Sequence, residues 1–324
     1  MEAKNILLFG ATGLIGTHIL EALIQSKDSF SRIAIYTSPG TVERKPDVLD
    51  AIKKSGVDVI VGEVGDEKRV GEAYQGIDTV ISALGRDALS SQLSLINAAA
   101  SSPSVKWFLP SEYGTDIEYS PASANERPHQ MKLKIRAALR ALPAPSEEAS
   151  VEGKLYHTYV VTGPFAEGYL SREPAGPEGG SFDVKAKKAN LLGEGGKGRV
   201  SLTTMVDVGK LVVAALKNPS ASRNKALRVN SFTTTPEDIL AEFEKQTGGE
   251  KWEKTYTPLD RLKELEEKAW AEGVPTATIF TLRRIWTEGG TLYDVRDNGV
   301  IGEPDTESLE DVVRRSVQRQ TGSG

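Results

Sequence analysis

The chain opens with Lys4-Asn5-Ile6-Leu7-Leu8-Phe9-Gly10-Ala11-Thr12-Gly13-Leu14-Ile15-Gly16-Thr17-His18, in which a short apolar run meets three glycines. The apolar run predicts a buried strand, and the pattern after Gly16 predicts a helix. Glycine suits a tight turn where backbone approaches a neighbouring strand or a ligand closely. Unpaired amides and the positive dipole end of such a helix attract phosphate. A glycine triplet also occurs in purely structural turns, but its place between a strand and a helix favours a dinucleotide site.

Length and charge limit the classes of protein to consider. The chain has 324 residues, a net charge of −5 and no cysteine. At this size it can bury a large core and is expected to form two lobes. Its acidic balance, without a basic cluster, argues against nucleic acid as a partner. The lack of cysteine excludes disulfides, thiolate chemistry and cysteine zinc sites, and we expect no metal site.

Targeting signals are not evident in the sequence. The apolar run at 6–9 is too short for a signal peptide, and no stretch has the apolar length of a membrane span. We therefore expect a soluble, cytoplasmic protein with a small-molecule substrate and no membrane partner. The oligomeric state stays open.

Strands and helices alternate through the first half of the chain. The expected strands are 6–9, 33–37, 57–61, 78–82, 105–109 and 157–161, and the expected helices are 17–27, 46–55, 67–74, 89–100 and 128–142. This rhythm predicts an α/β fold with a Rossmann-type, doubly wound parallel sheet and crossover helices. A polar, proline-rich stretch at 143–150 predicts an exposed loop.

Beyond residue 162 the rhythm weakens. We expect a loop at 171–180, a hairpin turn at 192–198, a strand at 226–229, and helices at 206–217, 235–247, 258–271 and 307–319. The predicted division is a dinucleotide-binding domain, residues 1–155 with about 200–232, and a smaller, mostly helical substrate-binding lobe, about 156–199 with 233–324. Such a lobe would close a cleft above the carboxyl ends of the strands, where open α/β sheets bind ligands.

The end of the second strand bears on which dinucleotide binds. An acidic residue there bonds the ribose 2′-hydroxyl of NAD, whereas basic groups accept the 2′-phosphate of NADP. Here the strand ends Tyr36-Thr37-Ser38-Pro39-Gly40 without a carboxylate, and Arg44 and Lys45 follow. Guanidinium and ammonium groups both bind phosphate, which favours NADPH. The alternative is a solvated basic pair, beside which Glu43 weakens the signal.

The reacting groups are less obvious. Many enzymes of this fold use a Tyr-x-x-x-Lys pair, and no lysine here has a tyrosine four residues before it. The helix at 128–142 instead offers Lys132, Lys134 and Arg136. Lys132 and Arg136 lie one turn apart, so we expect them to share an edge that faces the cleft. A lysine there can protonate or hydrogen-bond an atom that gains negative charge, while a solvated lysine is the alternative.

Three stretches together resemble the isoflavone reductase-like family. They are residues 10–16, Gly-Ala-Thr-Gly-Leu-Ile-Gly; residues 107–116, Trp-Phe-Leu-Pro-Ser-Glu-Tyr-Gly-Thr-Asp; and residues 132–136, Lys-Leu-Lys-Ile-Arg. The family includes phenylcoumaran benzylic ether, pinoresinol–lariciresinol and isoflavone reductases, and it is an atypical short-chain dehydrogenase group related to NmrA-like regulators. The resemblance continues in order through residues 163–169, 206–209 and 253–256, and the Pro-Ser-Glu-Tyr-Gly segment is its most specific part.

The resemblance implies NADPH-dependent reduction with a lone lysine in the proton-transfer role, which matches Lys132, four residues before Arg136. With the basic pair named above, the expected cofactor-binding residues are Gly10, Thr12, Gly13, Leu14, Ile15, Gly16, Thr37, Arg44, Lys45, Ser82, Ala83, Leu84, Lys132, Pro164 and Phe165. The expected substrate contacts are Tyr113, His129, Phe165 and Tyr169. For His129, a surface histidine at a helix start is the alternative.

The chain departs from the family where substrate selection is expected. Thr37 stands where the family commonly has arginine, and residues 125–130 and 143–153 differ from the family pattern. We therefore expect a reductase of a conjugated or aromatic small molecule, such as an enone, ketone or benzylic ether, and leave the substrate open. The competing interpretation is an NmrA-like, NADP(H)-sensing regulator without turnover, because a fold hosts many functions.

Overall fold

The computed structural model describes residues 2–143, 155–172 and 176–322. The loop predicted at 143–150 lies outside these residues except for Pro143. Seven parallel strands form the central sheet in the order β10-β6-β5-β4-β1-β2-β3. Their bounds are β1 Asn5–Phe9, β2 Arg32–Thr37, β3 Asp58–Val61, β4 Thr79–Ser82, β5 Trp107–Leu109, β6 Tyr156–Val161 and β10 Lys225–Arg228. The predicted doubly wound, Rossmann-type parallel sheet is confirmed.

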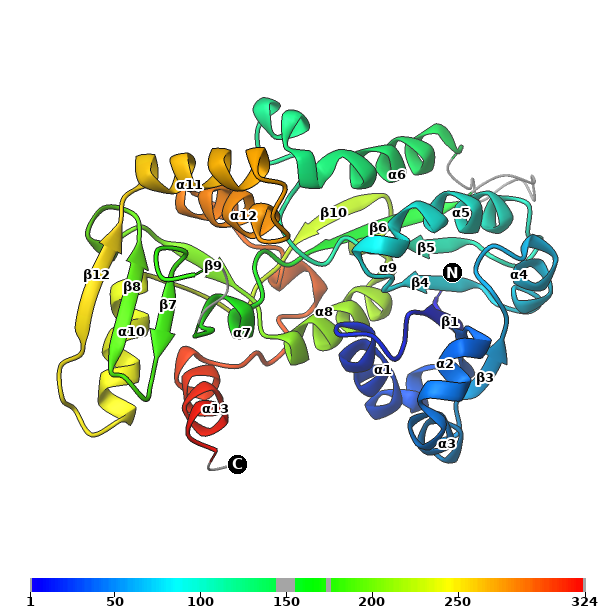
Figure 1. Ribbon diagram of the computed structural model, residues 1–324. Helices are drawn as coiled ribbons and strands as arrows, with labels where there is room; N and C mark the ends of the chain where they lie inside the picture. The colour runs from blue at the N-terminus through cyan, green and yellow to red at the C-terminus, as the bar shows by residue number, and fades with distance from the viewer. Residues whose placement is uncertain (1, 144–154, 173–175, 323–324) are drawn as a thin grey trace.

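Helices cover both faces of this sheet (Figure 1). They are α1 Gly16–Gln25, α2 Pro39–Arg44, α3 Pro46–Lys54, α4 Glu67–Ala73, α5 Gln92–Ala100, α6 Gln130–Ala141, α8 Met205–Lys217 and the short α9 Pro219–Ser222. The side chains of α1, α3 and α8 pack on one face and those of α4, α5 and α6 on the other.

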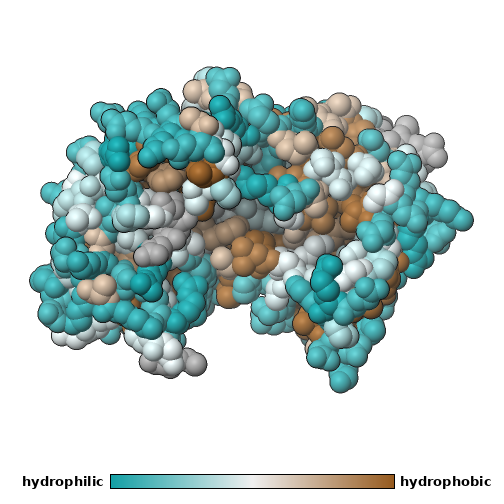
Figure 2. Space-filling model, viewed as in Figure 1, coloured by the Kyte–Doolittle hydropathy of each residue, from teal (hydrophilic) through white to brown (hydrophobic). Residues whose placement is uncertain are grey.

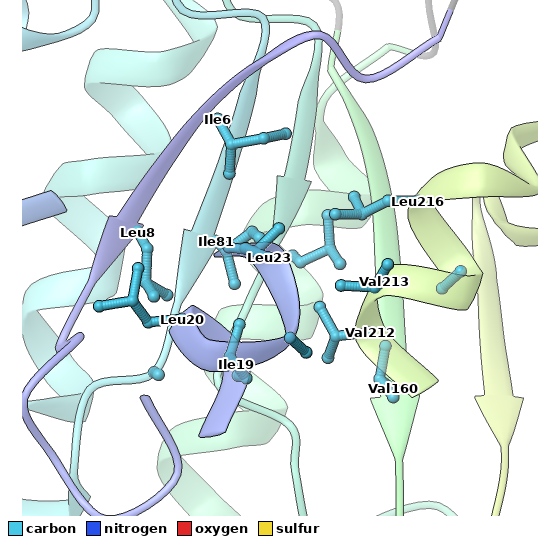
Figure 3. Close-up of a cluster of buried hydrophobic side chains, with 14 of the residues drawn as sticks. Ile6, Leu8, Ile19, Leu20, Leu23, Ile81, Val160, Val212, Val213 and Leu216 are labelled. Carbon is cyan, nitrogen blue, oxygen red and sulfur yellow. The ribbon is translucent and has the colours of Figure 1, made fainter. Parts of the chain in front are cut away.

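The apolar run of β1 is explained by these two layers. Ile6 and Leu8 contribute to the cluster under α1 and α8, and Leu7 and Phe9 to the cluster under α5 and α6. Successive side chains of a strand point to opposite faces, so a strand covered on both faces is apolar throughout. Figure 3 shows the first cluster, in which side chains of β1, β4 and β6 meet those of α1 and α8.

Helix α8 packs unusually closely on α1. A Cβ atom added at Gly209 would lie 2.2 Å from the carbonyl oxygen of His18. Only glycine fits this crossing without moving one of the helices. The helix that begins at the glycine turn is thereby held by an element nearly two hundred residues later.

The second half of the molecule, at the left of Figure 1, has more helical than strand residues and also contains two small sheets. A three-stranded sheet has the order β12-β8-β7, and β9 pairs with β11 in a separate antiparallel pair. The strands are β7 Ser181–Asp183, β8 Lys188–Leu192, β9 Val200–Leu202, β11 Phe232–Thr234 and β12 Glu253–Thr257. The helices are α7 Ala166–Tyr169, α10 Pro236–Gln246, α11 Leu259–Ala271, α12 Ala277–Thr287 and α13 Leu309–Thr321.

Two sequence expectations fail in this half. The hairpin turn at 192–198 is wrong, because β8 and β9 lie in different sheets and a single helical turn at Glu194–Gly196 joins them. Positive φ values at Gly193, Gly195 and Gly196 redirect the chain there, which glycine allows at little cost. Strand β6, which the proposed boundary at 155 assigned to the second lobe, pairs with β5 and β10 in the central sheet.

Within the described ranges, no helix has the length and apolar character needed to span a bilayer. The same residues contain no cluster of three or more histidine, cysteine, aspartate or glutamate side chains arranged to hold a metal ion.

Candidate active site

The site lies where the strand order reverses. Strands β1 and β4 are neighbours, with Phe9 opposite Ser82, yet the chain proceeds from β1 towards β3 on one side and from β4 towards β6 on the other. Open α/β sheets bind ligands in the crevice outside the carboxyl ends of the strands at such a point. The predicted glycine turn follows β1 here, and residues 83–85 follow β4.

Two of the three glycines are required by backbone packing. Gly10 has a φ of +77°, and a Cβ there would lie 2.5 Å from the carbonyl oxygen of Ala83. A Cβ at Gly16 would lie 2.0 Å from the carbonyl oxygen of Gly10, whereas the Gly13 amide donates to that same oxygen at 2.9 Å. The turn therefore requires glycine at positions 10 and 16, where backbone atoms leave no room for a Cβ.

The start of α1 suits an anionic group. Gly13, Leu14 and Ile15 line a cavity, and the Leu14 side chain is 66% exposed. No side chain caps this helix start, and its first turn contains no acidic residue. The first amides of an α-helix lack partners within the helix, and with the helix dipole they bind phosphate.

The basic pair lies beside this turn on an element that the sequence reasoning missed. Pro39 begins α2, and the Ser38 side chain accepts a hydrogen bond from the Thr41 amide as a cap. Lys45 Nζ donates to the carbonyl oxygen of Thr12 at 2.8 Å, and Arg44 is exposed in the last turn of α2. The side chain of Thr37 is buried at the end of β2.

The cavity has a volume of about 420 Å³ and lies between the two halves of the molecule. Figure 2 shows a hollow there with hydrophobic residues gathered in it. Of the predicted site residues, those that line the cavity are Gly13, Leu14, Ile15, Ala83, Leu84, Tyr113, His129, Lys132, Pro164 and Phe165. Those that do not are Gly10, Thr12, Gly16, Thr37, Arg44, Lys45, Ser82 and Tyr169.

Lys132 is the lysine of the cavity. It lies half-buried in the first turn of α6, whereas Lys134 is exposed. A Cβ atom added at Gly114 would lie 3.9 Å from the Nζ of Lys132. Burial lowers the pKa of Lys132; the Glu112 carboxylate opposes this shift, and Arg136 adds to it. A half-buried lysine with a lowered pKa gives up its proton more readily than an exposed lysine.

Arg136 does not share the cavity edge with Lys132, so that expectation is wrong. Its side chain is 1% exposed and donates to Glu112 at 2.9 Å and to Glu118 at 2.7 Å. Its guanidinium also lies over the Tyr159 ring, 4.5 Å from the centroid. The two side chains, one turn apart, have different surroundings. Lys132 lines the cavity, whereas Arg136 points to the carboxylates that follow β5.

Two buried polar groups on residues of the cavity have no hydrogen-bond partner among the described residues. His129 is 2% exposed, so the surface alternative is wrong; its Nδ1 lies 2.9 Å from the carbonyl oxygen of Ser123, and within the described ranges its Nε2 has no partner. In the same part of the chain the buried hydroxyl of Tyr113 has none either. Burial lowers the pKa of His129 and raises that of Tyr113, so both side chains are neutral at pH 7.

Helix α12 supplies the wall that sequence reasoning missed. Leu282 and Trp286, four residues apart, both line the cavity. Tyr169 lies outside it, buried beside Trp286 at 6.1 Å between ring centroids and under the Arg283 guanidinium. Tyr169, in the single turn of α7, packs in the core of the second half. Trp286 lines the cavity, and Tyr169 does not. The helical spacing of Leu282 and Trp286 was the available signal.

The sequence matches the model of a known family. The model of the NmrA-like family matches residues 2–284. The chain belongs to the NmrA-like family.

Curated relatives of this NmrA-like protein are plant reductases, as the sequence resemblance implied. It is 30% identical to isoflavone reductase of Pisum sativum, over 91% of each chain, and 29% identical to phenylcoumaran benzylic ether reductase PT1 of Pinus taeda, over 81% of this chain and 80% of that one. The fold is similar to that of leucoanthocyanidin reductase of Vitis vinifera, solved in a binary complex with NADPH. The TM-score is 0.77 with 18% identity, over 97% of this chain and 99% of that one.

Proposed function

We propose that this NmrA-like protein is an NADPH-dependent reductase of a conjugated or aromatic small molecule, such as an enone, ketone or benzylic ether. The observation that carries the proposal is a shared cavity, because the uncapped start of α1 and the Lys132 ammonium line the same space. The curated relatives are reductases, and the solved leucoanthocyanidin reductase holds NADPH.

The residues present fit this cofactor. The amides of Leu14 and Ile15 would hold the pyrophosphate, since the Gly13 amide already donates to Gly10. Arg44 and Lys45, beside the turn, would hold the 2′-phosphate by charge-assisted hydrogen bonds. Residues 83–85 and Phe165 would border the nicotinamide end. When bound, NADPH supplies the hydride.

Lys132 has the proton-transfer role in this proposal. Its Nζ would give a proton to the substrate atom that gains negative charge as the neighbouring carbon is reduced. The apolar walls, formed by Leu84, Leu89, Ile117 and Leu282 among others, would exclude water from that step. Lowering of its pKa by burial makes the proton easier to release than from an exposed lysine.

The test is NADPH oxidation, followed by absorbance, over a panel of enones, aryl ketones and benzylic ethers. Lys132→Met should lower kcat/KM by about 10²–10⁴-fold, the usual contribution of a general acid, while NADPH affinity stays within about threefold. Lys134→Met is the matched control, because Lys134 lies two residues away on the same helix and is exposed. Full turnover by Lys132→Met would overturn the assigned role. NADPH binding without oxidation by any acceptor would favour the NADP(H)-sensing regulator.

A further inference from the structure

His129 offers a hydrogen-bond acceptor that no described residue uses. The residue is 2% exposed and lines the same cavity as Lys132, and among the described residues Nε2 has no partner. Buried polar atoms in folded proteins are almost always paired, so an unpaired one beside a cavity indicates a ligand. The other ring nitrogen is not free in this way.

The tautomer of His129 follows from its partner. Nδ1 lies 2.9 Å from the carbonyl oxygen of Ser123, which can only accept a hydrogen bond. Nδ1 therefore carries the proton, and in the neutral ring Nε2 carries the lone pair. Burial and the charge of Lys132 both lower the pKa of His129 and keep the ring neutral. His129, one of the residues that line the cavity, thus holds a buried acceptor, whereas the ammonium of Lys132, another lining residue, can only donate.

The segment that carries His129 is held rigidly. The Ser123 hydroxyl contacts the carbonyl oxygens of Ile117 at 2.8 Å and Ser120 at 2.6 Å, which fixes the carbonyl that orients the ring. From the opposite side, Arg284 of α12 donates to Glu126 at 2.7 Å. A preorganised acceptor loses little freedom when a ligand binds, so its hydrogen bond contributes fully to selectivity.

We propose that His129 Nε2 accepts a hydrogen bond from a hydroxyl group of the substrate, so that the site selects hydroxylated aromatic acceptors over their deoxy and O-methyl analogues. The aromatic part is argued from the walls, where Phe165 and Trp286 face the cavity. That the ligand is a substrate rests on the proposed reductase function, whereas the preference for a hydroxyl group can be measured by binding alone. Its reason is that an analogue without the hydroxyl leaves the buried nitrogen unpaired.

The experiment measures binding of three matched ligands by calorimetry: p-coumaraldehyde, cinnamaldehyde and p-methoxycinnamaldehyde, with hydroxychalcone and chalcone as a second pair. Each is titrated into the full chain with and without NADP+. The expected wild-type result is about 5- to 10-fold tighter binding of the hydroxylated member, the ratio that one net hydrogen bond supports. NADPH oxidation is measured separately with the same compounds, so loss of turnover with retained preference would contradict the reductase proposal alone.

Two variants separate ligand recognition from a structural role of His129. His129→Asn keeps an amide donor near the position of Nδ1, for Ser123, but removes the Nε2 acceptor. His129→Gln places an amide near Nε2 and gives up the Ser123 bond. If Nε2 recognises the hydroxyl, His129→Asn should lower the preference to about 1–2-fold at an unchanged melting temperature, and His129→Gln should retain part of it.

Other outcomes overturn the proposal. They are equal affinity within every pair for the wild type, including no measurable binding, and an undiminished preference in His129→Asn. Loss of preference in both variants together with a lowered melting temperature would assign His129 to holding the Ser123 segment instead.

Discussion

Replacing Arg136 by methionine removes the cation from a buried group of carboxylates beside the cavity. Arg136 is 1% exposed and donates to Glu112 at 2.9 Å and to Glu118 at 2.7 Å. Glu112 is fully buried, and its Oε1 has no hydrogen-bond partner in the described part of the chain. Arg136→Met therefore leaves an uncompensated buried carboxylate, a change that costs about 3–5 kcal/mol. Urea unfolding should show a loss of that size in the free energy of unfolding.

The matched control is Arg140→Met. Arg140 lies one turn later on α6 and contacts the same Glu118 carboxylate at 2.6 Å, but its side chain is 50% exposed, so its loss should cost less than about 1 kcal/mol. Adding Glu112→Gln to Arg136→Met neutralises the stranded charge and should restore roughly half of the loss. A cost below about 1 kcal/mol for Arg136→Met, or no recovery in the double variant, would refute the buried-charge reasoning.

Three further results are expected. Gly16→Ala should abolish NADPH binding in a fluorescence titration, because its Cβ would lie 2.0 Å from the carbonyl oxygen of Gly10. The control is Gly71→Ala in α4, away from the cavity, where an added Cβ would meet no described atom within 4 Å and NADPH should bind within about twofold of wild type. Equal affinities would contradict this account of the turn. Lys45→Ala should weaken NADPH binding by about tenfold and leave NADH binding nearly unchanged. An equal loss of affinity for both cofactors would contradict the assignment of Lys45 to the 2′-phosphate. Because burial lowers the pKa of Lys132 below the ordinary lysine value, kcat/KM should fall as pH rises through that lowered pKa. The folded state binds this proton less tightly than the unfolded chain, so the free energy of unfolding should rise with pH between the two pKa values, and Lys132→Met should abolish both effects.

The first half of the fold was predictable because its signals are local. Each buried strand of the central sheet is a short apolar run, and turn residues separate it from the next helix, so type and order followed from periodicity. The ends of these strands and helices differ from the predicted ones by up to three residues. Helix α2 was missed because it has only six residues and lies in a stretch that contains Pro39 and Gly40, which suggest a loop.

The second half and part of the site were less predictable, since long-range pairing decides them. Strands β8 and β12 pair although their partner residues are 65 positions apart, as with Lys188 and Glu253. The local sequence of either strand does not predict this pairing. The lysine of the cavity followed from family resemblance, but the diverging environments of Lys132 and Arg136 depend on where the carboxylates after β5 lie. Trp286 enters the cavity from α12, an element that sequence reasoning left unassigned, and it displaces Tyr169 from its expected role.

The late arrival of α8 and β10 has a consequence for the order of folding during synthesis. Until Lys217 has been made, the apolar face of α1 lacks the complete α8, whose Gly209 lets the two helices meet. Until Arg228 has been made, β6 is also an open sheet edge. An unpaired edge and uncovered apolar surface are the features that recruit chaperones or other nascent chains. The central sheet and α1 are therefore completed only by residues far beyond β6. A ribosome paused before Met205 should hold a protease-sensitive α1, and one paused well beyond Arg228 a protected α1.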